Sequence, residues 1–238
     1  MGIKREDRKN GGELIKVYKD YLLQKDQKEA DKMLDMLFLH NYEDICHLYL
    51  LSSLTALDSL SKGHFLFEDV NYTKGQLSPE DTSFTQGGDS AMLEFSCRLK
   101  TPLPKELSIH TPAGSASAYK SRLYLTIPVV AGIMKHYYKD CSSYYYLPEE
   151  DRAVHKSIGR YVAKEYRRTC TPDKCYIKKE GVFLPFYSQK QTAGLKLPLY
   201  RPDYNSPVHY IEFDELTEKG LEQLTEYLTD FLNYILFN

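Results

Sequence analysis

A histidine and a carboxylate stand four residues apart near the start of the chain. They are His40 and Asp44, in the segment LFLHNYEDICHLYLL, and His47 follows seven residues after His40. Residues four apart share one face of a helix. An imidazole beside a carboxylate on that face can hold a metal and assist deprotonation of a metal-bound water. Helices also carry such residues by chance, so the spacing is also compatible with a helix face that binds no ligand.

Two cysteines form a second candidate. Cys170 and Cys175 are separated by four residues, and Cys141, His136 and His155 are nearby in the sequence. A zinc site usually needs two close pairs of ligands, and no second pair matches this one. The chain is also long enough to fold without disulfides. We therefore expect reduced structural thiols in a turn.

A third candidate combines tyrosines with basic residues. Its residues with a possible role in binding nucleic acid are Tyr145, His155, Lys156, Arg160, Lys164 and Arg167. Aromatic rings can stack on bases while Lys and Arg follow the phosphates, as in proteins that bind single strands. The alternative is a tyrosine-rich sheet edge that packs on a helix and turns its hydroxyls to water.

The charge is distributed unevenly along the chain. Residues 152–179 hold nine basic and two acidic residues, whereas residues 203–238 hold eight acidic residues and one lysine, although the net charge is only -2. A basic block can follow phosphates, or the acidic tail can neutralise it within the molecule. The second alternative requires no partner.

The elements that must position these residues follow from hydrophobic periodicity. Apolar residues at three- and four-residue spacing predict helices over 11–62 and over Thr217–Leu236. Short β-branched and aromatic runs within 64–138 predict about five antiparallel strands, joined by turn-rich connections at 73–90 and at PAGSASA from Pro112. Acidic residues at 149–151 and basic residues at 164–168 predict a helix between them. The predicted fold class is α+β, with N-terminal helices, a central antiparallel sheet and C-terminal helices.

Composition restricts the class of protein. With 238 residues, of which 42% are hydrophobic and 27% charged, the chain is expected to fold as a globular protein. No apolar run is long enough for a membrane span and no secretory signal is visible, so we expect a cytoplasmic protein without membrane contact. The phosphate-loop, dinucleotide, serine-hydrolase and zinc-protease motifs are absent from the sequence.

Several strings resemble a known family. GGELIKVYKDYLL and LDMLFLHNYEDICHLYLL, with YYYLPEEDRAVHKSIGRYV and CYIKKEGVFLP downstream, are similar to the C-terminal part of YprB-like proteins over about half of the chain. These proteins have a ribonuclease H-like domain and belong to the DEDD-type 3'-5' exonucleases. The resemblance implies a nuclease that uses Mg or Mn and acts on DNA or RNA. It implies that Asp44 is a catalytic metal ligand and that His40 occupies the catalytic proton-handling position, matched with Asn41.

The chain departs from the family pattern in one important respect. The first two acidic motifs would precede Gly11, where only ten residues stand. We therefore interpret residues 1–62 as the helical remnant of a ribonuclease H-like domain and residues 63–238 as an α+β C-terminal domain. The predicted function is a fragment or subunit of an exonuclease, inactive alone, whose N-terminal helices are covered by a missing upstream segment or by a second copy. The alternative is a non-enzymatic module that binds nucleic acid or protein.

Overall fold

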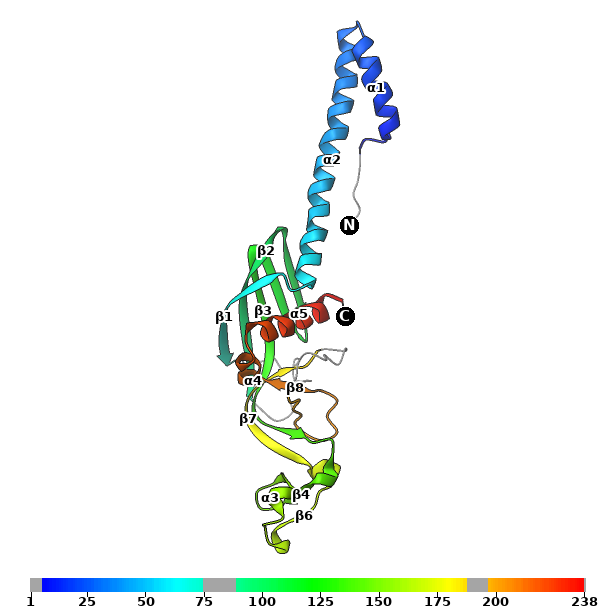
Figure 1. Cartoon of the computed structure of the whole chain (residues 1–238). Coiled ribbons are helices and arrows are strands. Elements are labelled where there is room, and N and C mark those ends of the chain that lie inside the picture. The colour runs from blue at the N-terminus through cyan, green and yellow to red at the C-terminus, as the bar shows by residue number, and fades with distance from the viewer. Residues whose placement is uncertain (1–5, 75–88, 188–196, 238) are drawn as a thin grey trace.

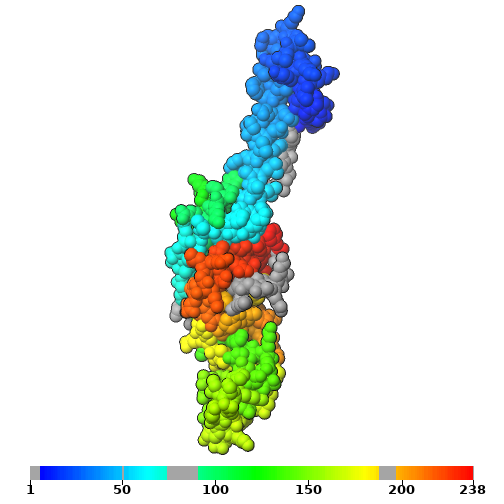
Figure 2. Space-filling model, viewed as in Figure 1, coloured from blue at the N-terminus to red at the C-terminus, as the bar shows by residue number. Residues whose placement is uncertain are grey.

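The computed structural model describes residues 6–74, 89–187 and 197–237. The molecule is elongated and has three parts (Figures 1 and 2). A helical arm at one end consists of α1 (Gly11–Leu23) and α2 (Gln27–Ser61). The body contains a five-stranded sheet with α4 and α5, and the distal lobe, residues 138–175, lies at the end opposite the arm.

The two helices of the arm begin at residues with capping side chains. Asn10 accepts a hydrogen bond from the backbone N–H of Glu13, whose side chain accepts one from Asn10 in return. Asp26 accepts from the backbone N–H groups of Lys28 and Glu29. The predicted helical region is confirmed, with a break at residues 24–26. Within the described ranges, no helix is long and apolar enough to cross a membrane.

The sheet of the body is antiparallel, with the strand order β1-β2-β3-β7-β8. Its strands are β1 (Phe65–Lys74), β2 (Asp89–Thr111), β3 (Gly114–Tyr137), β7 (Tyr176–Pro185) and β8 (Tyr210–Glu212). Alternate residues of β2 from Ala91 to Leu99, and of β3 from Leu123 to Val129, are buried. Successive strand residues face opposite sides of a sheet, so this alternation places one face of the sheet in the core. The predicted α+β class is confirmed.

The tip of the β2–β3 hairpin belongs to the core. The sequence predicts a polar connection at PAGSASA, but this prediction is wrong, because Ala113, Ala116 and Ala118 are buried in the main apolar cluster. The pairing register of β2 shifts twice between Arg98 and Leu107, where the hairpin bends. A Cβ atom at Gly114 would lie 2.4 Å from the carbonyl oxygen of Thr126. The small residues are therefore needed because the end of the β2–β3 hairpin lies close to the later part of β3, at Thr126. The other predicted connection, 73–90, lies mostly outside the described residues.

Two helices follow the sheet near the C-terminus. They are α4 (Phe213–Glu218) and α5 (Leu221–Phe237), and Gly220, whose φ is 100°, stands between them. The sequence predicts one helix from Thr217, whereas the left-handed backbone at Gly220 ends α4 and starts a separate helix. Figure 1 shows α5 lying across the sheet. Its stripe of buried residues is Leu224, Tyr227, Leu228, Phe231, Leu232 and Ile235.

The distal lobe contains a small sheet in place of the predicted long helix. Its strands are β4 (Tyr144–Leu147), β5 (Arg152–His155) and β6 (Arg168–Thr169), in the order β5-β4-β6. The helix α3 (Lys156–Gly159) has only four residues. The predicted helix between residues 149 and 168 is wrong because its first part pairs with β4. At Gly159, an added Cβ would lie 2.9 Å from the ring of Tyr145, so this turn also packs closely on β4.

Candidate functional site

His40 and Asp44 lie next to each other on α2, as the four-residue spacing predicts. Nε2 of His40 is 3.1 Å from Oδ2 of Asp44, and Nδ1 of His40 is 2.5 Å from Oδ2 of Asp7. Asp7 is buried, whereas the side chain of Asp44 is 47% exposed. Both ring nitrogens of His40 are thus engaged, and carboxylates on two sides fix the orientation of the ring.

The N-terminal segment is attached to α2 through Glu43. The backbone N–H groups of Glu6 and Asp7 donate to Oε1 and Oε2 of Glu43, at 2.7 and 3.3 Å. Glu43 is buried, so these hydrogen bonds also satisfy its carboxylate. Sequence reasoning does not find Asp7 or Glu43. Apart from their charge, nothing in the local sequence distinguishes these two residues, because a contact between residues more than thirty positions apart leaves no local pattern.

The arm does not provide a metal centre by itself. In the described part of the chain, no three His, Cys, Asp or Glu side chains are grouped so that they could hold a metal ion. Two-metal nucleases need several carboxylates around the scissile phosphate. Beside Asp44, the nearest carboxylate that contacts His40 is that of Asp7, which accepts at the other ring nitrogen. The described residues therefore do not fit the Mg or Mn site that the family resemblance implies.

The middle of α2 is apolar around much of its circumference and is exposed. Its large exposed side chains are Phe38, Tyr42, Ile45, Leu48, Tyr49, Leu51 and Leu54. Since successive helix residues are rotated by about 100°, the side chains from Ile45 to Leu54 point over more than half of the circumference. Helices that are apolar on most sides are normally buried. Figures 1 and 2 show this segment extending away from the body.

The first helix of the arm leaves a similar face uncovered. Leu14 is buried, but Ile15, Tyr18 and Leu22, at three- and four-residue spacing, are each more than half exposed. The arm thus exposes large apolar side chains on both of its helices.

The distal lobe brings three of the predicted nucleic-acid-binding residues into contact. The guanidinium carbon of Arg167 is 4.6 Å from the centre of the Tyr145 ring, and Nζ of Lys156 is 5.4 Å from it. Arg167 also donates a hydrogen bond to the carbonyl oxygen of Gly159 at 2.6 Å. The ring of Tyr145 is therefore already engaged by cations of its own lobe.

His155, Arg160 and Lys164 are placed separately. His155 caps α3, because its Nδ1 atom accepts from the backbone N–H of Ser157 at 3.2 Å. Arg160 and Lys164 are exposed in the segment that follows, and Arg160 donates to the hydroxyl of Tyr161. These six residues do not form one pocket. They are distributed along a turn-rich segment at the end of the molecule.

Asp151 connects the lobe to the body. Its Oδ1 atom accepts hydrogen bonds from the hydroxyls of Tyr146 and Tyr176, at 2.5 and 2.6 Å, and its Oδ2 atom pairs with Lys178 of β7. Burial by itself raises the pKa of Asp151, but the hydrogen bonds from Lys178, Tyr146 and Tyr176 outweigh it and hold the pKa well below its usual value. The charged form of Asp151 therefore stabilises the junction.

Three thiols meet in the small core of the lobe. Cys170 and Cys175 pack against Ala153, with Cys141 beside them. Burial, together with the neighbouring thiols, raises the pKa of Cys175, so the thiol stays protonated and is a poor nucleophile. The five cysteines are free, as the sequence predicts for a chain with reduced thiols.

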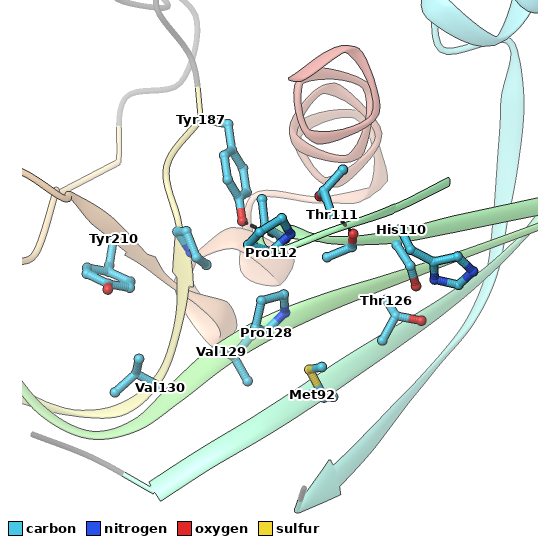
Figure 3. A pocket seen from close by; sticks show the side chains of 14 residues that line it. Met92, His110, Thr111, Pro112, Thr126, Pro128, Val129, Val130, Tyr187 and Tyr210 are labelled. Carbon is cyan, nitrogen blue, oxygen red and sulfur yellow. Dashed lines mark hydrogen bonds between the residues drawn. The ribbon is translucent and has the colours of Figure 1, made fainter. Parts of the chain in front are cut away.

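A pocket lies where the tip of the β2–β3 hairpin returns to the sheet. It encloses about 780 Å³ of empty space, part of it open solvent, and Figure 3 shows Tyr187, Pro112 and Pro128 around it. The hydroxyl of Tyr187 donates to the carbonyl oxygen of Ala113 at 3.0 Å, and burial raises the pKa of this hydroxyl. The lining is mostly apolar, and sequence reasoning does not find the pocket because its walls come from distant segments.

Comparisons with known proteins give no match. The chain matches no family model, and neither the curated proteins nor the solved structures contain a similar protein. The resemblance to YprB-like exonucleases stays a prediction, and so do the catalytic roles of His40 and Asp44.

Proposed function

We propose that this chain is one part of a metal-dependent 3'-5' exonuclease that acts on nucleic acid, and that it is inactive until another polypeptide segment covers the arm. The observation that carries the proposal is the exposed, apolar middle of α2. This segment lies directly beside the His40–Asp44 pair, in the same continuous helix. A partner that buries the apolar residues would also reach Asp44.

The state of the two motif residues supports the same proposal. His40 is oriented by Asp7 and Asp44, and Asp44 remains about half exposed, so it is accessible to a partner. The described residues do not hold the metal alone, so the remaining carboxylates would come from the covering segment. The non-enzymatic alternative requires a partner on the apolar surface but no metal and no catalysis.

The test is reconstitution of activity. The polypeptide encoded upstream of the Met1 codon would be fused in frame or co-expressed, and the product incubated with 5'-labelled single-stranded DNA and RNA in Mg²⁺ or Mn²⁺. We expect shortening from the 3' end that EDTA stops. We expect Asp44→Asn to lower the rate by more than about 100-fold.

The matched control is Asp58→Asn, which changes an exposed aspartate on the same helix that pairs with Lys62 at the surface. This variant is expected to keep full activity. The proposal is wrong if the reconstituted protein degrades neither DNA nor RNA with any divalent metal. It is also wrong if Asp44→Asn is as active as Asp58→Asn. A first indication is whether the upstream sequence encodes a strand that contains Asp-x-Glu.

A further inference from the structure

The structure separates the basic residues between Arg152 and Lys179 into two groups. Three of them are neutralised within the molecule. Arg152 pairs with Glu150, Lys178 pairs with Asp151, and Lys179 lies 3.1 Å from Glu212 and 2.6 Å from Glu215. Burial by itself lowers the pKa of Lys179, but the hydrogen bonds to both glutamates outweigh it and raise the pKa. For Lys179, the alternative that the acidic tail neutralises the basic block within the molecule is confirmed.

The remaining basic residues all lie in residues 156–174, which we call the tip. None of them is within 4 Å of a carboxylate oxygen in the described part of the chain. They are Lys156, Arg160, Lys164, Arg167, Arg168 and Lys174. With Glu165 and Asp173 as its only acidic residues, the tip has a net charge of +4.

The glutamates of the acidic tail that neutralise Lys179 do not reach this charge. Glu212 and Glu215 belong to β8 and α4 in the body, and Figure 1 shows the lobe extending from the opposite end of β7. Before α3, Glu150 and Asp151 are already paired with Arg152 and Lys178, and Asp140 interacts electrostatically with Lys156. The positive potential of the tip therefore faces the solvent.

Two tyrosine rings are open beside these charges. Tyr161 is 78% exposed and Tyr166 is 51% exposed, whereas Tyr145 lies under Arg167 and Lys156. Tyr161 and Tyr166 are thus the more exposed rings of this region. The guanidinium of Arg160 is 4.9 Å from the Tyr161 ring, so a cation and an aromatic face are presented together.

We propose that the tip binds single-stranded nucleic acid, with Arg160, Lys164 and Arg168 on backbone phosphates and Tyr161 and Tyr166 stacked on bases. Exposed aromatic rings among unpaired cations are the features by which proteins bind single strands. A double helix is a poorer fit for the tip, because the major groove accepts a helix or a β-ribbon, and within residues 156–174 α3 has four residues and β6 has two. The proposal rests on the proposed function for its biological role, but binding can be measured without catalysis.

The test uses the full 238-residue chain and fluorescein-labelled oligonucleotides, dT20 and rU20, in fluorescence anisotropy titrations. We expect binding that weakens steeply with salt. Replacing Arg160, Lys164 and Arg168 together by Ala should reduce the slope of log K against log salt by about 2, since each phosphate contact on a single strand contributes about 0.7. The matched control replaces Lys16, Lys19 and Lys25, three exposed lysines of the arm, and should leave affinity and slope unchanged.

The tyrosines are tested by substitution and rescue. Tyr161→Ala or Tyr166→Ala should weaken binding by roughly 5- to 150-fold for each stacked base lost. Tyr161→Phe should restore affinity, because the ring face and not the hydroxyl makes the contact. Circular dichroism would verify that each variant is folded, as expected for exposed positions.

Three outcomes would overturn the proposal. They are the absence of oligonucleotide binding at low salt, an equal loss of affinity in the arm control, and stronger binding to phosphatidylserine vesicles than to the oligonucleotides in a parallel titration. Oligonucleotide binding without nuclease activity in the reconstituted protein would support the tip while rejecting the exonuclease. Nuclease activity of the reconstituted protein, without any effect of the tip substitutions on oligonucleotide binding, would support the exonuclease while rejecting the tip. The two proposals can therefore fail separately.

Discussion

The helices α2 and α5 are both rich in large apolar residues, but only α5 is covered. In α5 the apolar residues from Leu224 to Ile235 form one stripe, and this stripe is buried against the sheet. In α2 they are spread around the helix, and the segment from Phe38 to Leu54 is largely exposed, whereas Ala56 and Leu60 at its end enter the core.

The difference between the two helices teaches how apolar patterns should be interpreted. A single stripe needs one surface, which the sheet of this chain provides. An apolar surface that continues around a helix needs contacts on several sides. The described residues that contact α2 belong to α1, the N-terminal segment and β2 and, near its C-terminal end, to α5. The pattern of α2 is therefore typical of a helix that is buried in a larger assembly.

The largest expected effect is the loss of stability on truncating a phenylalanine of α5, compared with the same truncation in α2. Phe231→Ala in α5 should lower the free energy of unfolding by about 3–5 kcal/mol, since it removes a fully buried ring from the core. Phe38→Ala in α2 should change it by less than about 0.5 kcal/mol, because this ring is 62% exposed. Urea unfolding followed by circular dichroism measures both values. A large loss for Phe38→Ala would mean that a second copy of the chain already covers the arm.

Hydrogen exchange of the wild-type chain should show a difference in amide-opening free energy between α2 and α5 that is smaller than the effect of Phe231→Ala. The backbone amides of α2 from Ile45 to Leu54 should open with a free energy at least about 2 kcal/mol below that of the α5 amides, because few tertiary contacts protect them. Mass spectrometry of peptic fragments measures this difference. The covering polypeptide of the proposed exonuclease should remove the difference when it is added. Equal protection in the free chain would contradict the exposed arm.

The junction of the distal lobe sharpens the comparison, because polar contacts and not an apolar face attach it. Asp151→Asn should cost about 1–2 kcal/mol at pH 7, since the charged acceptor of three hydrogen bonds is lost from a partly exposed site. Asn tolerates the φ of 48° at this position, so the backbone should be unaffected.

The cost at Asp151 should depend on pH. The native pKa of Asp151 is lowered, so its contribution is complete above the ordinary pKa and is lost as the pH falls from about 5 through the native value. Wild type and Asp151→Asn should therefore become equally stable in acid. Limited proteolysis of residues 138–175 measures the opening of the lobe. A difference that persists unchanged at pH 2 would contradict the role of the charge.

The smallest effect is expected at His40. His40→Ala should cost about 1 kcal/mol, because it removes the hydrogen bond to the buried Asp7. The loss should be confined to the arm and appear as faster hydrogen exchange in residues 6–10. His40→Asn serves as the comparison, since an amide can keep one of the two contacts. Faster exchange in α5 would show that the arm and the body are more strongly coupled than the contacts indicate.

Local patterns predict much of this fold. The helices of residues 11–61, the buried alternation of Ala91 to Leu99 and the stripe of α5 all repeat with the period of their own element. The contact of His40 with Asp44 is predicted for the same reason, because both belong to one helix. The neighbouring contact of His40 with Asp7 is not predictable, because thirty-three residues separate them.

The sequence by itself determined the helices of the arm, the strand over Ala91–Leu99 and the apolar stripe of α5, because periodic apolar residues select an element before any distant contact forms. Only the tertiary structure decided which charges remain open. It pairs Lys179 with the acidic tail and leaves Arg160 and Lys164 exposed, although all three belong to one basic block. It also pairs Arg152–His155 with β4 and so replaces a predicted helix by a strand. Charge neutralisation and strand pairing depend on which distant segments meet, and that information is not local.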